Sequence, residues 1–561
     1  MTRPQGLKIS GPSLPASLSR SISLPRRVSE RSTADISEIE HGHDPQPGFP
    51  KLNVLPIGLD SAAVNRVQRW VTGIAVVDFD IDQGPVVCAV YPSMALTTSD
   101  VSNIAFSSFP DSPQFEEGSQ MHSFRLRLTH STSAIIPDYP TSQPLFINGF
   151  SYFTQCKDPS SRRGYRQQAL VLLTLHSYPA LFSLVLSLLG PTHSRDGGGG
   201  AGSTDIGALK HAFSNWENWP DHILGESVVL TFLDTEIKVD VPHGVDEQLF
   251  WSNPAGAQGS SRIYTPCIPH LLNAIPLFAA SSLLPNLWAI WENLVLCEPI
   301  LVCGDSPALV SSVIWWIVEL GRGLPLSHSH DIRPYMTIND TDCSALINAK
   351  RPGKAGLVLG VTNPWLEKQC MHWGCAISLK STPASSSKAR FMFGIGSGSD
   401  PANGGFGTHG WKSRSYKRYI SKDRSLLKKL EDAWKGGNER EQVEATLLLA
   451  QHFNARTREL LLPLTRYLNT LIPSPAELAA SSLGTSISAA APRLKPFSRT
   501  AFFASLKDHG CPLPFRSAKQ RIQFYERWLK CKAFGIWLAK QEEIVRSVLQ
   551  KEKEGGYGSA P

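Results

Sequence analysis

The hydrophobic pattern of this chain changes twice along its length, and each change restricts what the segment can fold into. From Trp70 to about residue 175, apolar residues come in β-branched runs that begin with the hairpin pattern WVTGIAVVDFDIDQGPVVCAVYP. From about Ile263, short apolar strands alternate with helical stretches, and beyond residue 411 apolar residues recur at helical spacing. This order predicts an α/β fold with an antiparallel sheet and helices first, an α/β core next, and an α-helical C-terminal part.

The predicted boundaries follow the changes in composition and periodicity. Residues 1–66 are rich in Ser, Pro and Arg. We predict a disordered tail there, because such a segment cannot bury enough apolar surface to offset the entropy lost on ordering. The remaining predicted segments are an upstream lobe (67–250), a central α/β domain (263–378), a flexible insertion (379–410), a downstream helical domain (411–548) and a flexible tail (549–561).

The composition is that of a globular protein with long insertions. A chain of 561 residues, 42% of them hydrophobic, can bury large cores and divides into roughly two to four domains. Its net charge of +7 permits contact with acidic partners or anionic membranes, but no nucleic-acid-binding motif accompanies it. The ten cysteines are scattered and the N-terminus lacks the apolar segment of a signal peptide, so we expect a cytoplasmic protein without disulfides. The most apolar span, Ile268 to Trp291, is interrupted by proline and asparagine, which favours a packed core and leaves only peripheral membrane contact.

Three local patterns suggest chemistry, but each lacks a necessary part. The run Asp78, Asp80 and Asp82 resembles a calcium loop without its glycine and its final glutamate, so a hairpin turn is the better interpretation. The motif GFGTHG (405–410) matches a dinucleotide-binding pattern but lies within a Gly/Ser-rich insertion. The cysteines of CMHWGC (370–375) have no second ligand pair, which favours buried thiols over zinc. With no nucleophile motif either, we predict no metal, no cofactor and no covalent catalytic residue.

The end of one core strand carries the most distinctive polar residues. In LVLGVTNPWL, a buried strand stops at Asn363, Pro364 and Trp365, which would place an amide and an indole on a stiff loop suited to gripping a partner. The alternative is that Trp365 caps the core and Asn363 satisfies its own turn. A second candidate surface, by the same reasoning, is the loop of Asp331, Arg333 and Tyr335.

Two further segments point to partners. The run WKSRSYKRYISKDRSLLKKL (411–430) carries eight Lys or Arg against one Asp, which is typical of a solvated helix face or of a contact with acidic protein or anionic lipid. Arg20 to Pro25 follows the R-S-x-S-x-P pattern that 14-3-3 proteins recognise when the second serine, here Ser23, is phosphorylated. Chance occurrence in a Ser-rich tail is the alternative for the second pattern.

Taken in order, these segments resemble the DENN family, and within it the DENN domain-containing protein 6 branch. The resemblance spans about residues 68 to 545. It is carried by the hairpin pattern above and by NIAFSSFPDS, YFTQCKDPSSRRGYRQQALVLL, LWAIWENLVLCEPILVCGDSPA, DIRPYMTIND, LGVTNPW, SYKRYISKDRSLLKKL and FYERWLKCKAFGIWLAK. The chain departs from the family pattern near residue 200, at about 380–410 and near 480–492, which affects loops and not the fold.

The resemblance implies a longin-like N-terminal lobe packed against an α/β and helical DENN lobe, with a Rab-type small GTPase held in the groove between them. The implied activity is guanine-nucleotide exchange without a covalent catalytic residue, on endosomal recycling membranes. The alternative is a non-catalytic DENN-type scaffold that binds a GTPase or a membrane partner. The residues expected to bind the GTPase are Asn363, Pro364, Trp365, Asp331, Arg333 and Tyr335.

Overall fold

The computed structural model of this protein describes most of the chain beyond residue 49. All described residues belong to the unit that spans Gly48–Pro561. They are residues 50–111, 117–128, 145–159, 161–196, 206–241, 263–266, 274–348, 352–370, 372–379, 410–412, 418–474, 477 and 494–555. Ser23 and the GFGTHG motif up to residue 409 lie outside them.

A six-stranded sheet, called the first sheet here, forms the N-terminal part. Its strands are β1 (Asn53–Val54), β2 (Gly73–Asp80), β3 (Gly84–Tyr91), β4 (Gly118–Arg127), β5 (Phe146–Lys157) and β6 (Tyr165–Thr174), in the order β1-β3-β2-β6-β5-β4. All neighbours are antiparallel except β1 and β3. The predicted hairpin between β2 and β3 is confirmed, because Asp80 Oδ1 accepts the backbone N–H groups of Asp82 and Gln83 at 2.8 and 2.9 Å.

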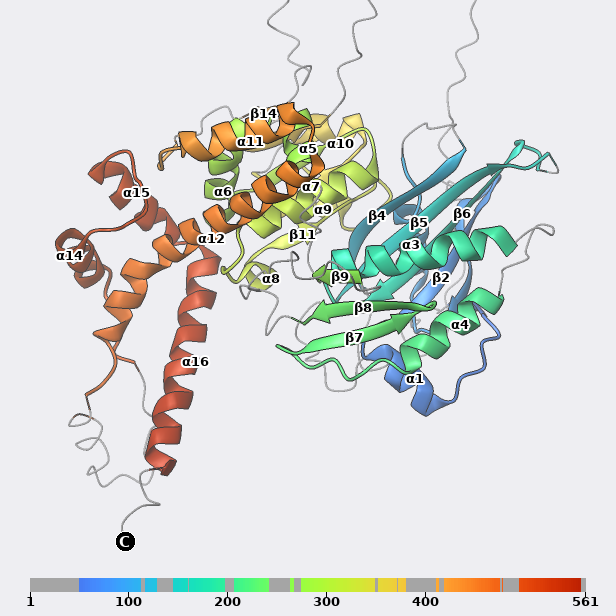
Figure 1. Ribbon diagram of the computed structural model, residues 1–561, viewed down its shortest axis with the longest axis horizontal. Helices are drawn as coiled ribbons and strands as arrows, with labels where there is room; N and C mark the ends of the chain where they lie inside the picture. The colour runs from blue at the N-terminus through green and yellow to red at the C-terminus, as the bar shows by residue number, and fades with distance from the viewer. Residues whose placement is uncertain are drawn as a thin grey trace, which may run out of the picture. The chain divides into compact units, whose positions relative to one another are not determined.

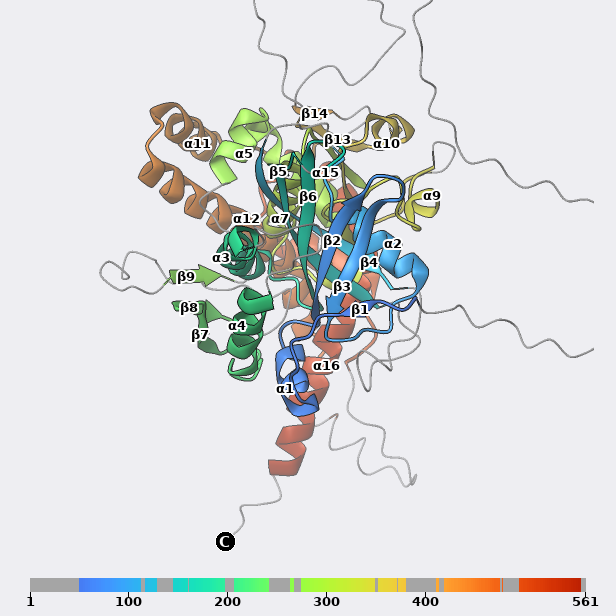
Figure 2. The same cartoon turned by 90° about the vertical axis from the view of Figure 1, so that its right-hand side faces the viewer.

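The two faces of the first sheet bury alternate residues of each strand, as the pleat requires. In β2, Ile74 and Val76 face the core beneath α3 (Pro179–Asp196) and α4 (Ile206–Glu217). Ala75 and Val77 face the opposite core, beneath α2 (Thr98–Ser107). Figure 2 shows α2 and α3 on opposite sides of the sheet. A small sheet of β7 (Ser227–Phe232), β8 (Thr235–Asp240) and β9 (Ile263–Pro266) extends the α3/α4 side (Figure 1).

Ordered structure begins earlier than the predicted end of the disordered tail at residue 66. Strand β1 pairs with β3, Leu55 and Ile57 are buried, and α1 (Ser61–Gln68) is capped by the Asp60 side chain. The disorder prediction is therefore wrong for residues 50–66. A two-residue strand has no periodicity, and this stretch is ordered by docking two apolar side chains onto a core that other segments build.

A five-stranded sheet, called the second sheet, forms the centre. Its order is β11-β12-β10-β13-β14, parallel except for the β13–β14 pair. The strands are β10 (Ile300–Cys303), β11 (Asp331–Arg333), β12 (Leu357–Val361), β13 (Cys375–Ser378) and β14 (Gly410–Lys412). The helices around it are α5 (Ala274–Ala280), η4 (Leu284–Asn286), α6 (Leu287–Val295), α7 (Pro307–Leu320), α8 (Leu326–Ser329), α9 (Cys343–Leu346) and α10 (Pro364–Gln369).

The C-terminal helices share one apolar core with a face of the second sheet. These helices are α11 (Arg424–Gly436), α12 (Glu439–Asn469), α14 (Arg499–His509), α15 (Ala518–Trp528) and α16 (Lys532–Gly555). Ile300 and Val302 of β10 belong to the same buried cluster as Phe453 of α12 and Trp528 of α15. Helix α16 continues to Gly555, so the predicted flexible tail from residue 549 is helical for its first seven positions.

No single described helix is long and apolar enough to cross a membrane. The helices Ala274–Ala280 and Leu284–Val295 are long and apolar enough only when taken together, and a 93° bend separates them. Most side chains of this pair are buried in the central core. The mixed α/β class, with an antiparallel sheet first and helices last, is confirmed. The domain boundaries stay predictions.

Candidate functional site

The polar loop after β12 is held in one conformation by its own residues. Asn363 precedes α10 with extended backbone angles, and its Oδ1 accepts the backbone N–H of Trp365 at 2.8 Å. Pro364 occupies the first helical position, where its fixed φ suits the helix. Leu366 is fully buried beneath the turn. The side-chain amide of Asn363 therefore stabilises its own turn, which was one of the two interpretations of the sequence.

Trp365 does not cap the core. Its side chain is 51% exposed, on the first turn of α10, while its neighbour Leu366 points inward. An exposed indole on a turn anchored by a helix cap and a proline is a rigid apolar projection of the kind that dominates protein interfaces. Binding roles for Asn363, Pro364 and Trp365 stay predictions.

The first sheet reaches this loop through the segment after α2. The Tyr335 hydroxyl accepts the Asp111 N–H at 3.3 Å and lies 3.5 Å from the carbonyl of Phe109. Met336, the residue after Tyr335, donates its backbone N–H to the carbonyl of Gly360 at 2.9 Å, two residues before Thr362. Asp111 therefore lies close to the end of β12, so the segment after α2 and the second sheet meet near the loop that carries the exposed Trp365.

Tyr335 enters the core of the first sheet although it belongs to the second. It is 1% exposed, packs in the cluster of Ala75 and Val77, and meets the His122 ring edge-on at a centroid distance of 5.4 Å. Burial raises the pKa of Tyr335 well above its usual value, so its hydroxyl stays protonated. Gly360 of β12 makes room for the same segment, because a Cβ there would lie 2.1 Å from the carbonyl oxygen of Pro334.

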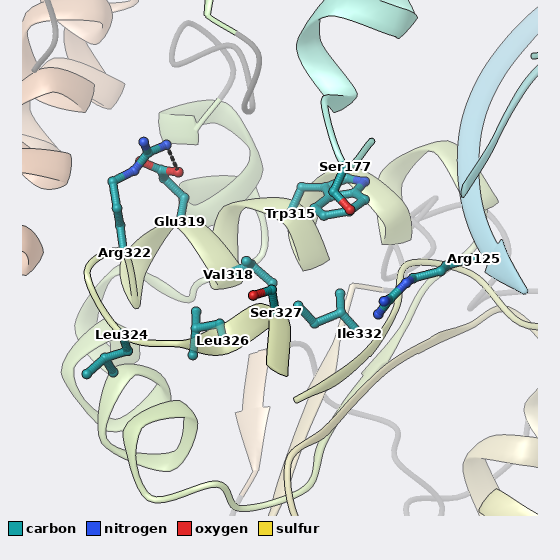
Figure 3. Close-up of a pocket in the computed structure, with 10 residues that line it drawn as sticks. All are labelled: Arg125, Ser177, Trp315, Val318, Glu319, Arg322, Leu324, Leu326, Ser327 and Ile332. Carbon is teal, nitrogen blue, oxygen red and sulfur yellow. Dashed lines mark hydrogen bonds and ion pairs between the residues drawn. The ribbon is translucent and has the colours of Figure 1, made fainter. Parts of the chain in front are cut away.

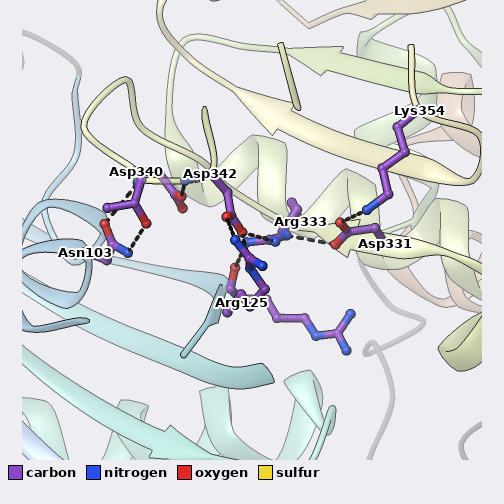
Figure 4. Close-up of polar contacts among 9 residues, drawn as sticks. Asn103, Arg125, Asp331, Arg333, Asp340, Asp342 and Lys354 are labelled. Atoms are coloured by element: carbon purple, nitrogen blue, oxygen red, sulfur yellow. Dashed lines mark hydrogen bonds and ion pairs between the residues drawn. The ribbon is translucent and has the colours of Figure 1, made fainter. Parts of the chain in front are cut away.

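Arg333 is the centre of a cluster of charges between the two sheets, called the ionic joint here. Its Nε donates to Asp331 Oδ1 at 2.8 Å, its Nη2 to Asp342 Oδ2 at 2.7 Å, and its Nη1 to the carbonyl of Arg125 in β4 at 3.2 Å. Lys354 Nζ forms an ion pair with Asp331 Oδ2 at 2.8 Å, and Arg127 of β4 forms one with Asp342. Figure 4 shows Arg333 between the two carboxylates, with Lys354 beyond Asp331.

Charge pairing outweighs burial at both carboxylates of the ionic joint. Burial alone would raise the pKa of Asp331, but Arg333 and Lys354 hold it below its usual value. Burial opposes ionisation of Asp342 as well, yet hydrogen bonds from Arg127 and Arg333 lower its pKa. The Arg125 and Arg333 guanidinium carbons lie 4.2 and 5.0 Å from the centroid of the Phe146 ring, which adds cation–π contacts.

The six predicted residues differ in where the structure places them. Asn363, Pro364 and Trp365 lie at the surface. The side chains of Arg333 and Tyr335 are 2% and 1% exposed and join the two sheets, so a partner cannot reach them in this conformation. The Asp331 carboxylate forms ion pairs with Arg333 and Lys354.

Several residues of the junction were not predicted. Asn103 of α2 exchanges two hydrogen bonds with Thr341, at 2.9 and 3.2 Å. Trp315 of α7 donates its indole N–H to Ser123 of β4 at 2.8 Å. The sequence held one signal for the ionic joint, since Asp331, Arg333, Asp340 and Asp342 stand close together among apolar residues. No such signal marks Asn103 or Ser123, whose partners lie far along the chain.

A cavity of about 60 Å³ lies at the same junction, between Arg125 of β4 and Trp315 of α7 (Figure 3). Its wall includes a buried ion pair in which Arg322 Nε donates to Glu319 Oε1 at 2.6 Å, and burial raises the pKa of Glu319. Sites for small-molecule ligands enclose roughly 300 to 1,000 Å³. This cavity holds a few water molecules at most and is too small for a nucleotide.

Metal-site geometry is absent from the described residues, where no group of three His, Cys, Asp or Glu side chains is placed to hold an ion. Cys370 and Cys375 are fully buried, in agreement with the prediction of buried thiols. Burial raises the pKa of Cys370 to about 12.

Comparison with known proteins gives matches along most of the chain. No protein-family model matches it. The chain is 27% identical over 516 residues to Protein DENND6A of chicken (Gallus gallus), covering 88% of this chain and 82% of that protein. It is 26% identical over 499 residues to Protein DENND6B of mouse (Mus musculus), covering 86% and 81%. It is also 26% identical over 535 residues to the Protein DENND6 homolog of Dictyostelium discoideum, covering 84% and 71%.

The similarity runs through both sheets and the C-terminal helices, because it covers more than four fifths of this chain in each comparison. Relatives from vertebrates and from an amoeba carry the same family name. Together with the ordered segments and the α/β architecture, these matches show that the chain is similar over most of its length to proteins of the DENN domain-containing protein 6 branch.

Proposed function

We propose that the chain is a guanine-nucleotide exchange factor that promotes GDP release from a Rab-type small GTPase in endosomal membrane trafficking. Similarity to the DENND6 proteins supports a small GTPase as the partner in general terms. The surface beside Trp365 supports a binding function that needs no acid, base or cofactor of its own.

The physical task of such a factor is differential binding. It binds the nucleotide-free GTPase more tightly than the loaded form, and by reciprocity it weakens nucleotide binding by the same factor. Each ~1.4 kcal/mol of this difference, if expressed in the transition state for release, raises the release rate about tenfold. Rigid surface anchors serve this task, because little of their binding energy is lost to ordering.

The observation that carries the proposal is the exposed indole of Trp365 on a preorganised turn. The turn lies at the end of a central strand, and Asp111, in the segment after α2, approaches the same end of the second sheet through Tyr335. We expect a GTPase that contacts Trp365 to meet the segment after α2 as well. This arrangement favours a partner that touches both lobes.

The test is a fluorescent-GDP release assay with the full chain and a panel of Rab GTPases. We expect acceleration for at least one GTPase, and a loss of about 30-fold in Trp365→Ala, which corresponds to an anchor worth about 2 kcal/mol. The matched control is Trp434→Ala, because Trp434 is a second exposed tryptophan, 40% accessible, on α11, which lies apart from α10 in Figure 2.

The outcomes separate the alternatives. A complete panel without acceleration would reject exchange activity. GTPase binding without nucleotide release would favour the scaffold, which requires the same surface and no differential affinity. Equal losses of exchange rate in the Trp365 and Trp434 variants would show that the β12 loop is not part of the interface.

We also propose a cytoplasmic protein that associates peripherally with endosomal recycling membranes. Arg424, Lys428 and Lys429 are exposed on α11 and offer cations to anionic headgroups. The double change Lys428→Glu with Lys429→Glu should reduce co-flotation with vesicles that contain phosphatidylserine. Unchanged co-flotation would assign these lysines to a solvated helix face.

A 14-3-3 protein is a further proposed partner, at phosphorylated Ser23. A phosphopeptide of residues 17–29 should bind 14-3-3 more tightly than its unmodified form, because the phosphate offers charge and acceptor oxygens to an arginine cluster. Equal binding of the two peptides would exclude this partner.

A further inference from the structure

Two cysteine side chains from distant segments meet where α6 ends and where α15 turns into α16. Cys297 follows α6, and Cys531 lies in the turn between the two C-terminal helices. The two thiols are close enough for each to influence the ionisation of the other. Cys531 Sγ also lies 3.1 Å from the carbonyl oxygen of Leu296, the residue before Cys297. Both cysteines are free thiols.

The backbone fixes this approach from both sides. Cys297 adopts a positive φ of 53°, and its carbonyl accepts the Gly356 N–H at 2.7 Å. The Cys531 N–H donates to the carbonyl of Trp528 at 2.9 Å. An ion pair between Arg527 and Glu298 joins the same two turns. The two turns that carry the cysteines are therefore held side by side by several contacts.

A metal site is the first alternative, because the His330 ring also lies against the Cys297 thiol. However, the described residues hold no group of three ligands placed for an ion. Both ring nitrogens of His330 have other partners, with Nδ1 2.8 Å from Ser329 Oγ and Nε2 2.9 Å from the carbonyl of Leu294. The cluster is therefore better described as a dithiol beside an imidazole.

The second alternative is inert packing, and another cysteine pair shows what that looks like. Cys343 and Cys370 are also near neighbours, and they are 5% and 0% exposed within an apolar cluster. Burial raises the pKa of Cys343 to about 11 and that of Cys370 to about 12, which keeps both thiols protonated. Protonated thiols are poor nucleophiles.

The pair at Cys297 differs in its electrostatics and its access. The neighbouring Cys531 thiol, with a further contribution from His330, lowers the pKa of Cys297 against the effect of burial. The pKa of Cys531 is raised in turn, because its proton is shared with Cys297. Cys531 is partly exposed, so a small oxidant can approach the pair from solvent.

We propose that Cys297 and Cys531 form a redox-active dithiol that a peroxide converts to a disulfide. The Cys297 thiolate attacks one oxygen of hydrogen peroxide, the O–O bond breaks, and the leaving hydroxide takes the Cys531 proton to form water. The new Cys531 thiolate attacks the sulfenic sulfur of Cys297, and the S–O bond breaks. The second hydroxide takes a proton from solvent. Each sulfur loses one electron, the peroxide gains two, and two water molecules form.

The disulfide would join the second sheet covalently to the C-terminal helices. It would close a loop of more than 200 residues, which constrains the unfolded chain. We expect the oxidised protein to unfold about 3 °C higher than the reduced protein, and dithiothreitol to reverse the shift.

The direct test is peptide mapping of the full chain after treatment with hydrogen peroxide. Remaining thiols are alkylated under denaturing conditions, and the non-reduced digest is analysed by mass spectrometry with fragmentation that separates Cys297 from Cys303. We expect a peptide that joins Cys297 to Cys531 and disappears on reduction. Cys343 and Cys370 should remain alkylated in the same sample and serve as the internal control.

Two variants sharpen the result. In Cys531→Ser, Cys297 has no second thiol, so dimedone labelling of its sulfenic acid should rise several-fold. In Cys156→Ser, which removes an exposed thiol elsewhere, the linked peptide should form as in the unmodified chain. A folded protein without the Cys297–Cys531 link, or with as much Cys343–Cys370 link, would overturn the proposal. Since the mapping uses the unmodified chain, it does not depend on either variant folding.

Discussion

The second sheet meets the first sheet through a cluster of charged side chains beside the buried Tyr335, whereas it meets the C-terminal helices through a continuous apolar core. At the ionic joint, Arg333 is held by carboxylates and by a carbonyl of β4. At the other junction, which we call the apolar joint, Trp288 and Trp291 of α6 pack against Phe453 of α12. A charged contact fixes orientation through specific atoms, while an apolar contact contributes in proportion to its buried area.

The two joints also differ in how a buried carboxylate is satisfied. Asp331 and Asp342 face arginine or lysine side chains. Glu292 at the apolar joint is fully buried and accepts the backbone N–H groups of Tyr419 and Ile420, at 2.7 to 3.2 Å. Burial raises the pKa of Glu292 to about 8, although those hydrogen bonds oppose the shift. The two joints should therefore respond to pH with opposite signs.

The largest expected effect is a truncation at the apolar joint. Trp291 is fully buried, with its indole N–H 3.3 Å from Thr457 Oγ1. Trp291→Ala should lower the free energy of unfolding by about 4 kcal/mol, through lost burial and a cavity. Urea denaturation measures this change. The exposed Trp434→Ala should cost about 0.5 kcal/mol or less, and similar losses in the two variants would contradict the apolar character of this joint.

The next effect is expected at the centre of the ionic joint. Arg333→Ala leaves Asp331 and Asp342 buried without their shared cation, and should cost about 3 kcal/mol of unfolding free energy. The matched control is Arg440→Ala. Arg440 pairs with Glu444 on the surface, where its side chain is 86% exposed, so little change is expected. Equal stabilities of the two variants would show that the ionic joint contributes no more than a surface pair.

A third effect concerns Glu292 and separates the joints by pH. A raised folded pKa means that the stabilising contribution is complete below the unfolded value near 4.5 and is lost as pH rises towards about 8. Glu292→Gln does not ionise. The unfolding free energy of the unmodified chain should therefore fall by about 2 kcal/mol relative to this variant between about pH 5 and 6.5. A parallel pH dependence of the two proteins would contradict a raised pKa of Glu292 in the folded protein.

The smallest effect is the opposite titration at Asp342. Its folded pKa is lowered, so its contribution is present above the unfolded value and is lost as pH falls through the folded pKa. Comparison with Asp342→Asn should show the advantage of the unmodified chain shrinking by about 1 kcal/mol below pH 4. This figure is small because the partner Arg127 is half exposed. An advantage that persists at pH 3 would contradict the ion-pair explanation.

The local part of this architecture was predictable, and the junctions were not. The β-branched run of β2 predicted its strand, and the turn residues Asp80 to Gly84 predicted the hairpin, because both depend on neighbours in sequence. The loop at Asn363 was found by the abrupt end of an apolar run. Arg333 and Tyr335 have the same polar pattern, yet their partners Arg125 and Phe109 lie more than 200 residues away. A single sequence carries no signal for such pairs, so a surface role and a buried role could not be distinguished.

The insertion of Tyr335 into the core of the first sheet has a consequence for biosynthesis. The last strand of that sheet, β6, ends at Thr174, about 160 residues before the tyrosine that fills part of its core. At ~5 to 20 residues per second, a ribosome adds Tyr335 roughly 8 to 32 s after β6. During this interval the nascent first lobe exposes the apolar site that Tyr335 later occupies. The core of the first sheet is therefore completed only after Tyr335 has been translated. A chaperone that covers this site would have to leave before the two sheets come together.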